Sequence, residues 1–261
     1  MVDRFFLTRQ REVHQQEPDS ITLLSGPPTC GKTSLLFQFA INSALECSSS
    51  NRKVVFICNR RRLETKPPYL SQGIDPSSDI FQGIKMKYVD DEDGIKKYFA
   101  AFHLNDTFPA AVIVDDFGDF FDERYFNYLI FKQPIFNLIS IITNMKIRSC
   151  QERYGNTRGR DLAMVRTLAL CHNATIHANK KGSCKLLLSD THHGDSPRLL
   201  FIYKRWIPTI FTVKGDGSGS FLLKYNNYSG NGSSKSTKIA KYSIAFQYLL
   251  LEGITEDGDE Q

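Results

Sequence analysis

The strongest constraint on the fold is the segment Gly26–Thr33, GPPTCGKT, which matches the pattern GxxxxGK[ST] without an insertion. It follows a short apolar run, Ile21–Leu24, and precedes residues 32–45, whose apolar positions approach helical spacing. A strand, a glycine-rich loop and a helix in this order direct backbone N–H groups and a helix N-terminus at an anion. The segment therefore predicts a phosphate-binding loop in an α/β domain.

The residue types in this loop indicate a site for ATP with Mg²⁺. Gly26 and Gly31 allow backbone N–H groups to approach phosphate oxygens, Lys32 would contact the β- and γ-phosphates, and the Thr33 hydroxyl would bind Mg²⁺. The predicted nucleotide-binding residues are Gly26, Pro27, Pro28, Thr29, Cys30, Gly31, Lys32, Thr33 and Ser34.

A second apolar run supplies the acidic partner of such a site. Residues 112–114 are Val-Ile-Val and are followed by Asp115, which we expect to hold the water shell of Mg²⁺. Its neighbour Asp116 could take that place instead. We therefore predict Thr33 and Asp115 as the magnesium ligands, and Lys32, Asp115 and Asp116 as the catalytic residues.

The rest of the chain predicts one α/β domain. Apolar runs typical of buried strands occupy 54–58, 85–89, 110–114, 186–189 and 242–251, and helical patterns occupy 94–102, 122–147, 161–178 and 197–206. Continuous apolar strands that alternate with helices indicate a mainly parallel sheet with helices on both faces. Residues 209–213 and 221–225 flank a glycine-rich loop and indicate a C-terminal antiparallel hairpin, whereas 59–83 looks irregular. We expect an N-terminal arm at 1–18, the domain at 19–253 and an acidic disordered tail at 254–261.

The charge distribution favours a polyanionic partner. The chain has 33 basic and 28 acidic residues, and five of the acids lie in the last ten positions, which leaves a formal charge of +10 in residues 1–251. A soluble charged surface would give the same count. No apolar run approaches the roughly 18 residues of a membrane helix, and residues 1–13 lack a signal-peptide segment. We expect a nuclear or cytosolic protein, not bound to membranes, whose cysteines are reduced.

Two basic clusters could contact nucleic acid. Residues 146–166 carry six Lys and Arg residues against two acids, with Tyr154 available for base stacking. The predicted DNA-binding residues are Arg148, Arg153, Tyr154, Arg158 and Arg160; the alternative is a solvated loop. The second cluster, Arg60–Arg62, could contact nucleotide, DNA or a neighbouring subunit, or could form only a solubilising turn.

Two histidines and a cysteine–histidine group have weaker signals. His192 and His193 could report the state of the γ-phosphate, but we favour a polar loop. The cysteine–histidine group consists of Cys171, His172, His177 and Cys184. It does not indicate a zinc site, because its spacing lacks the paired ligands that zinc sites use.

The order of these elements resembles the RecA-type recombinase core of the P-loop ATPases, over about residues 21–253. The segments 24–37, 54–62, 84–88 and 109–121 are similar to the small recombinase-paralogue ATPases that pair with a SWIM-type zinc-finger protein in Shu-type complexes. The resemblance implies a RecA-like P-loop core and a weak ATPase, stimulated by DNA or a partner, that assists homologous recombination in the nucleus. It also implies a SWIM-type zinc-finger partner, a recombinase or its paralogues, and single-stranded DNA.

Two segments bear on how far the resemblance extends. Phe37–Ala40 matches the Phe-x-x-Ala tether of recombinases, but its apolar spacing favours a core face. The family places a glutamate after the strand that follows the phosphate-loop helix, whereas this strand ends in Cys58-Asn59-Arg60. Neither an amide nor a guanidinium can accept a proton from water. We therefore expect slow hydrolysis, with Asp116 or a glutamate from another subunit as a substitute base.

Two other functions remain open at this point. The chain could be a scaffold that binds nucleotide and hardly turns it over. It could also be a small-molecule kinase with a phosphate loop, although such an enzyme would need a lid of arginines that closes over its substrate.

Overall fold

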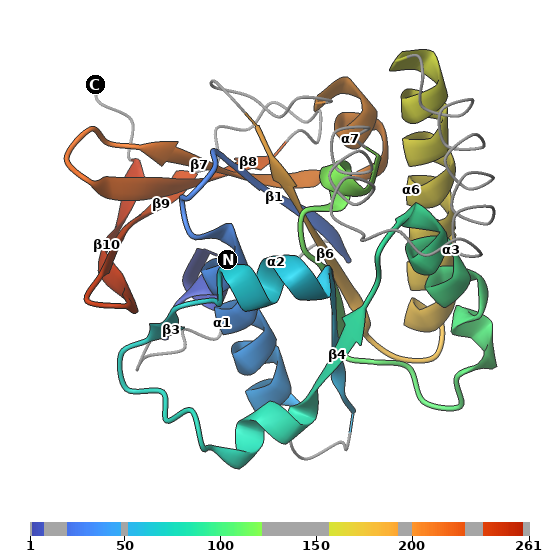
Figure 1. The fold of residues 1–261 in the computed structure, drawn as a ribbon, viewed down its shortest axis with the longest axis horizontal. Helices are drawn as coiled ribbons and strands as arrows, with labels where there is room; N and C mark the ends of the chain where they lie inside the picture. Colours follow the sequence, from blue (N-terminus) through green and yellow to red (C-terminus); the bar gives the residue numbers. More distant parts are fainter. Residues whose placement is uncertain are drawn as a thin grey trace, which may run out of the picture.

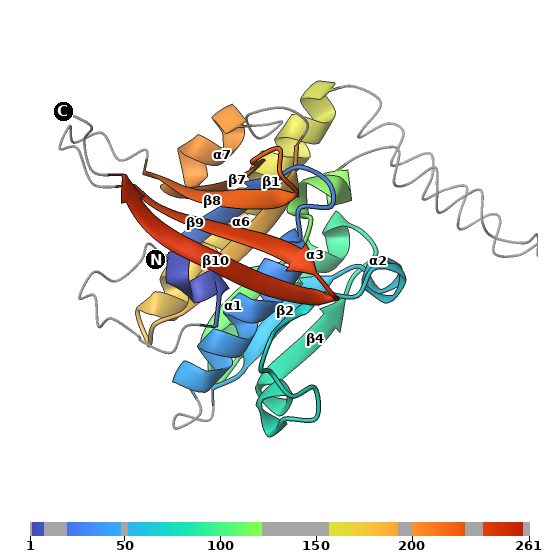
Figure 2. The same cartoon turned by 90° about the vertical axis from the view of Figure 1, so that its left-hand side faces the viewer.

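The computed structural model describes residues 2–7, 20–47, 52–121, 157–192, 200–227 and 237–257. Its strands form one ten-stranded sheet in the order β3-β10-β9-β8-β7-β1-β6-β5-β2-β4 (Figure 1). The strands are β1 (Ile21–Gly26), β2 (Val54–Cys58), β3 (Leu70–Ser71), β4 (Ile84–Tyr88), β5 (Ala111–Val114), β6 (Lys185–Thr191), β7 (Thr209–Gly215), β8 (Ser220–Asn227), β9 (Thr237–Ala245) and β10 (Tyr248–Asp257). The run from β7 to β4 is parallel, and β7 to β10 pair antiparallel side by side (Figure 2).

Helices cover both faces of the sheet. The α-helices are α1 (Lys32–Glu46), α2 (Arg60–Thr65), α3 (Glu92–Ala100), α6 (Thr157–Asn179) and α7 (Leu200–Trp206), and the 3-10 turns are η1 (Val2–Phe5), η3 (Asp79–Gly83), η4 (Phe102–Leu104) and η5 (Phe117–Phe121). One core lies under α3, α6 and α7, and the other lies under α1 and η1. No helix in the described part of the chain is long and apolar enough to cross a membrane.

The continuous apolar strands follow from this arrangement. In β5, Val112 and Val114 face the core under α6, whereas Ala111 and Ile113 face the core under α1. Since both faces are covered, alternation of polar and apolar residues is absent. The predicted α/β class, with a mostly parallel sheet and a C-terminal antiparallel hairpin, is confirmed.

The end of the chain differs from the prediction. Residues 242–251 are not one strand, because β9 and β10 meet at a two-residue turn, Phe246–Gln247, with φ of +53° and +65°. Such turns usually contain Asn or Gly, and Phe246–Gln247 has neither, so no local pattern indicates a turn here. β10 continues to Asp257, so the disordered tail expected from 254 is wrong for residues 254–257. Residues 258–261 lie outside the described residues.

Residues 59–83 also have more structure than expected. They contain α2, β3 and η3. Polar side chains cap the N-termini of two of these elements: Asn59 caps α2, and Ser78 caps η3. The helical pattern predicted at 122–147 lies outside the described residues.

The N-terminus is part of the core rather than an arm. Val2, Phe5 and Phe6 are at most 1% exposed. The Phe5 ring lies 5.6 Å from the Phe39 ring in α1 and 5.0 Å from the Phe211 ring in β7. The arm expected at 1–18 is therefore wrong for residues 2–6, while 8–18 lie outside the described residues.

Truncation of Phe5 tests whether the N-terminal residues contribute to the core. We expect Phe5→Ala to lower the free energy of unfolding by about 3–5 kcal/mol, because it removes a buried ring and leaves a cavity. Leu7→Ala is the matched control, since Leu7 is 41% exposed and its truncation should cost far less. Urea denaturation of both variants provides the measurement. Equal, small effects would mean that the N-terminus is only an arm.

Candidate phosphate-binding site

The loop between β1 and α1 requires glycine at both of its ends. A Cβ at Gly26 would lie 2.7 Å from Cys30 Sγ and 2.9 Å from Val213 Cβ. A Cβ at Gly31 would lie 2.4 Å from Ile244 Cδ1, and Gly31 has φ +79° as the N-cap of α1. The loop therefore packs tightly against β7 and β9, and no larger side chain fits at either glycine.

Strand β9 also fixes the loop by a hydrogen bond. The Tyr242 hydroxyl donates to the Cys30 carbonyl at 2.6 Å, and the tyrosine is fully buried. Burial raises the pKa of Tyr242 well above its usual value, so the hydroxyl stays a donor. The loop conformation thus depends on a residue more than 200 positions away.

The loop and the start of α1 make a positively charged cradle. Lys32 is 7% exposed, and its Nζ donates to the carbonyls of Gly26 at 3.3 Å and Pro27 at 3.1 Å. The first turn of α1 contains no acidic residue. An ammonium group inside the loop and the partial positive charge of a helix N-terminus both favour a bound anion.

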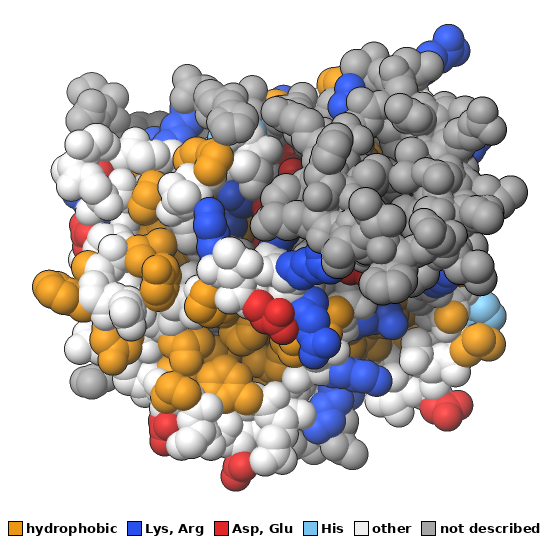
Figure 3. Space-filling model, viewed as in Figure 1, with side chains coloured by type: hydrophobic (Ala, Val, Ile, Leu, Met, Phe, Trp, Pro, Cys, Tyr) orange, Lys and Arg blue, Asp and Glu red, His pale blue; other side chains and the backbone are white. Residues whose placement is uncertain are grey.

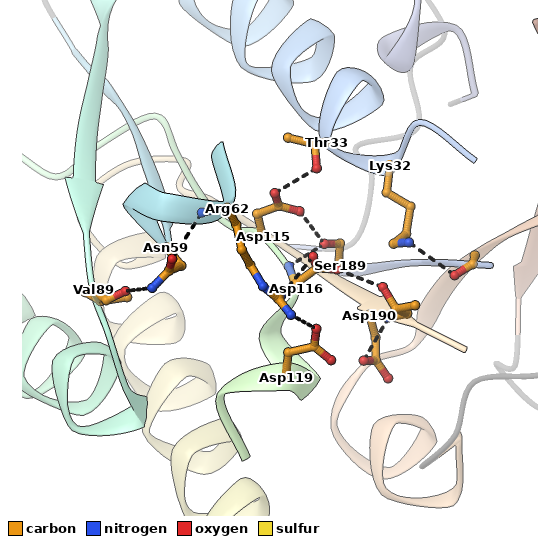
Figure 4. A network of polar contacts seen from close by, with 12 residues as sticks. Lys32, Thr33, Asn59, Arg62, Val89, Asp115, Asp116, Asp119, Ser189 and Asp190 are labelled. Carbon is orange, nitrogen blue, oxygen red and sulfur yellow. Dashed lines mark hydrogen bonds and ion pairs between the residues drawn. The ribbon is translucent and has the colours of Figure 1, made fainter. Parts of the chain in front are cut away.

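Thr33 and Asp115, the predicted magnesium ligands, lie in contact (Figure 4). Thr33 Oγ1 donates to Asp115 Oδ2 at 2.9 Å, and Ser189 Oγ, from the neighbouring strand β6, donates to Asp115 Oδ1 at 2.9 Å. Burial and the charge of Asp116 raise the pKa of Asp115 to about 7, against the opposing effect of the two hydrogen bonds. A hydroxyl and a buried carboxylate are oxygen donors that suit Mg²⁺.

Asp116 points into different surroundings from Asp115. It has φ +51°, its N–H donates to Ser189 Oγ at 2.8 Å, and Thr191 Oγ1 donates to its Oδ1 at 2.9 Å. Its Oδ2 pairs with Arg62 at 3.2 Å. Asp115 is therefore the acid that faces Thr33, whereas Asp116 faces Thr191 and Arg62.

Arg62 belongs to a small pocket beside Asp115. Its second nitrogen pairs with Asp119 Oδ2 at 2.5 Å. The pocket is lined by Cys58, Asn59, Arg62, Asp115, Asp116, Asp119 and Phe120. Figure 3 shows Lys and Arg side chains gathered across the middle of this face, near α2 and β4.

Asn59 is used structurally. It is 5% exposed, its Oδ1 accepts from Arg62 N at 3.2 Å as the N-cap of α2, and its Nδ2 donates to the Val89 carbonyl at 3.4 Å. The position where the resemblance implies a glutamate therefore holds an amide that is committed to helix capping and to strand β4.

His192 lies under the loop and not in a polar loop. It is 1% exposed, its Nδ1 lies 2.7 Å from Ser25 Oγ, and its N–H donates to the Gly26 carbonyl at 3.1 Å. The favoured polar-loop interpretation is wrong, because β6 extends parallel to β1 as far as Thr191. His193 lies outside the described residues.

The remaining predicted sites have mixed outcomes. Within the described ranges no group of three or more His, Cys, Asp and Glu residues could hold a metal ion. Phe39 is buried against Phe5, as a core face requires.

The predicted DNA-binding residues are only partly described. Arg148, Arg153 and Tyr154 lie outside the described residues, whereas Arg158 and Arg160 lie in the first turns of α6. Since α6 leads back into parallel strand β6, it begins at the sheet edge that carries the phosphate loop.

Two residues of the site were missed by the sequence analysis. Asp119 lies in a phenylalanine-rich turn, η5, whose position beside Arg62 has no local signal. Tyr242 lies in an apolar run, which predicts a core residue and not a residue of the site.

No model of a known protein family matches the sequence, and no curated protein matches it with significant similarity. The function is therefore inferred from the contacts of the loop, Asp115 and Arg62.

Proposed function

We propose that the chain is a RecA-like P-loop protein that binds ATP with Mg²⁺ at residues 26–34. The observation that carries this proposal is the 2.9 Å hydrogen bond between Thr33 and Asp115, which joins the loop to the end of β5. A phosphate-loop hydroxyl beside a strand-terminal carboxylate is the arrangement that a magnesium–triphosphate site needs.

Each residue has a definite part in this binding. The loop N–H groups and Lys32 would contact the phosphates, and Thr33 with Asp115 would hold Mg²⁺. The bound Mg²⁺ would offset the negative charge of the β- and γ-phosphates. Ser189 orients Asp115, since its hydroxyl donates to Oδ1 while Thr33 engages Oδ2.

The later elements support the RecA-like part of the proposal. The resemblance implies a helix and then a strand with a polar end after the strand that ends in Asp115. Here α6 and β6 occupy those places, and Ser189 and Thr191 contact Asp115 and Asp116. The β7–β8 hairpin follows, as the resemblance implies.

The wider biological role is proposed from the resemblance. It would be assistance to homologous recombination in the nucleus, with a SWIM-type zinc-finger protein, a recombinase or its paralogues, and single-stranded DNA as partners. The basic side chains near α2 and the start of α6 support a polyanionic partner. A scaffold that binds ATP and hardly turns it over is the second candidate, favoured by the amide at position 59.

Replacing Lys32 tests nucleotide binding. We expect Lys32→Ala to weaken binding of ATP with Mg²⁺ at least tenfold, because the variant loses a charge-assisted contact to phosphate. Lys53→Ala is the matched control, since Lys53 donates to the Gln82 carbonyl at the surface. Titration calorimetry gives both affinities. An unchanged affinity in Lys32→Ala would discard the phosphate-loop assignment.

Turnover should be much weaker than binding. A positioned general base supplies about 10²–10⁴-fold in rate, and Asn59 cannot serve as one. We expect slow phosphate release from the isolated chain, with acceleration only by single-stranded DNA or a partner protein. Steady-state phosphate release with and without these additions is the measurement. Hydrolysis by the chain alone at the rate of a full recombinase would contradict the argument.

The basic stretch around α6 should give salt-dependent DNA binding. The logarithm of the affinity for a single strand should fall with the logarithm of the salt concentration by about 0.7 per phosphate contact. Charge reversal at Arg153, Arg158 and Arg160 should flatten this slope in fluorescence-anisotropy titrations. A slope equal to that of the unmodified protein would move DNA binding elsewhere, with Arg60–Arg62 as the next surface to test.

A further inference from the structure

Arg62 is the basic residue of the pocket beside Asp115. Its two terminal nitrogens pair with Asp116 and Asp119, and the pocket that it lines includes Asp115 itself (Figure 4). Arg62 therefore lines the same pocket as the carboxylate that contacts Thr33. This places a planar, permanently charged donor next to the predicted metal position.

The other two arginines of the cluster lie elsewhere. Arg60 stacks over the Tyr88 ring at 4.8 Å and pairs with Glu64 at 3.3 Å, on the outer side of α2. Arg61 is exposed and does not line the pocket. The structure thus separates three residues that the sequence alone could not tell apart.

The pocket shares Asp115 with the predicted Mg²⁺ position, so a terminal phosphate bound at that position would lie beside the pocket. Mg²⁺ held by Thr33 and Asp115 would bridge the β- and γ-phosphates. A γ-phosphate would therefore approach the wall that the pocket shares with Asp115, whereas a diphosphate would not reach it.

The charges of this pocket make Arg62 important for such an approach. Asp115, Asp116 and Asp119 line it, and Arg62 is the cation among its lining residues. A phosphate entering beside these carboxylates would be repelled unless a cation faced it. A guanidinium can offer a phosphate two parallel hydrogen bonds.

We propose that Arg62 discriminates a bound nucleoside triphosphate from a diphosphate, because its guanidinium exchanges Asp116 and Asp119 for the terminal phosphate. This inference rests on the proposed nucleotide-binding function. Arg62 is a specificity-determining residue in this account, and it has no part in binding the α- and β-phosphates.

The local structure permits such an exchange without unfolding α2. The backbone is fixed, since Arg62 N donates to Asn59 Oδ1 and Leu63 N donates to the Asn59 carbonyl at 3.2 Å. The side chain is 40% exposed, and its partners Asp116 and Asp119 are 24% and 22% exposed. Ion pairs at this level of exposure contribute little to stability, so a stronger anion can replace them.

The test compares two affinities in one variant. In titration calorimetry with Mg²⁺, we expect Arg62→Ala to bind a non-hydrolysable ATP analogue about tenfold or more weakly, and ADP within about twofold of the unmodified protein. Arg61→Ala is the matched control from the same helix and should leave both affinities unchanged. An unaltered ratio of the two affinities in Arg62→Ala, or an equal loss of both with normal thermal unfolding, would overturn the proposal.

A second variant distinguishes a direct contact between Arg62 and the phosphate from simple neutralisation of Asp119 by Arg62. If Arg62 contacts the phosphate, the double variant Arg62→Ala with Asp119→Asn should remain deficient in binding the ATP analogue. Full recovery in that variant would show that Arg62 only neutralises Asp119, and would overturn the exchange. The proposed function fails independently, since it is discarded by an unchanged affinity for ATP with Mg²⁺ in Lys32→Ala.

Discussion

The phosphate loop is held in shape by the C-terminal half of the chain. Tyr242 donates to the Cys30 carbonyl, Ile244 packs against Gly31, and Val213 packs against Gly26. A loop with two glycines has little conformational preference of its own, because glycine accesses more backbone conformations than other residues. The motif therefore needs β7 and β9 to present its N–H groups in one direction.

The N-terminal turn and strand β9 meet at Tyr242. Phe6 lies 5.6 Å from the Tyr242 ring, and Phe5 contacts both α1 and β7. The same tyrosine thus touches the N-terminal turn through its ring and the phosphate loop through its hydroxyl. Damage to either end should reach the site, although neither end contains a residue of the motif.

The sequence predicts the elements whose signal is local. The strands β1, β2 and β5 are continuous apolar runs because both faces of the sheet are covered, and the loop motif brings Lys32 and Thr33 to a defined place. The contact of Thr33 with Asp115 also follows, since parallel strands end at one edge of the sheet and only β6 separates β1 from β5.

What the sequence does not predict depends on distant partners. The turn at Phe246–Gln247 has two residues at positive φ without glycine or asparagine, so no local pattern marks it. The burial of Phe5 requires α1 and β7, which lie far along the chain. The position of Asp119 in the pocket cannot be predicted locally, because its partner Arg62 lies 57 positions earlier.

A single residue connects the slow hydrolysis that we predict with the arginine of this site. Asn59 cannot take a proton from water, yet its side chain accepts from Arg62 N and so begins helix α2 at the pocket. A glutamate that reached toward a water molecule could not cap this helix with the same atom. The amide that cannot act as a general base therefore also fixes the backbone of Arg62 where its side chain meets Asp116 and Asp119. In the proposed function, such a site would favour recognition of the nucleotide over its hydrolysis.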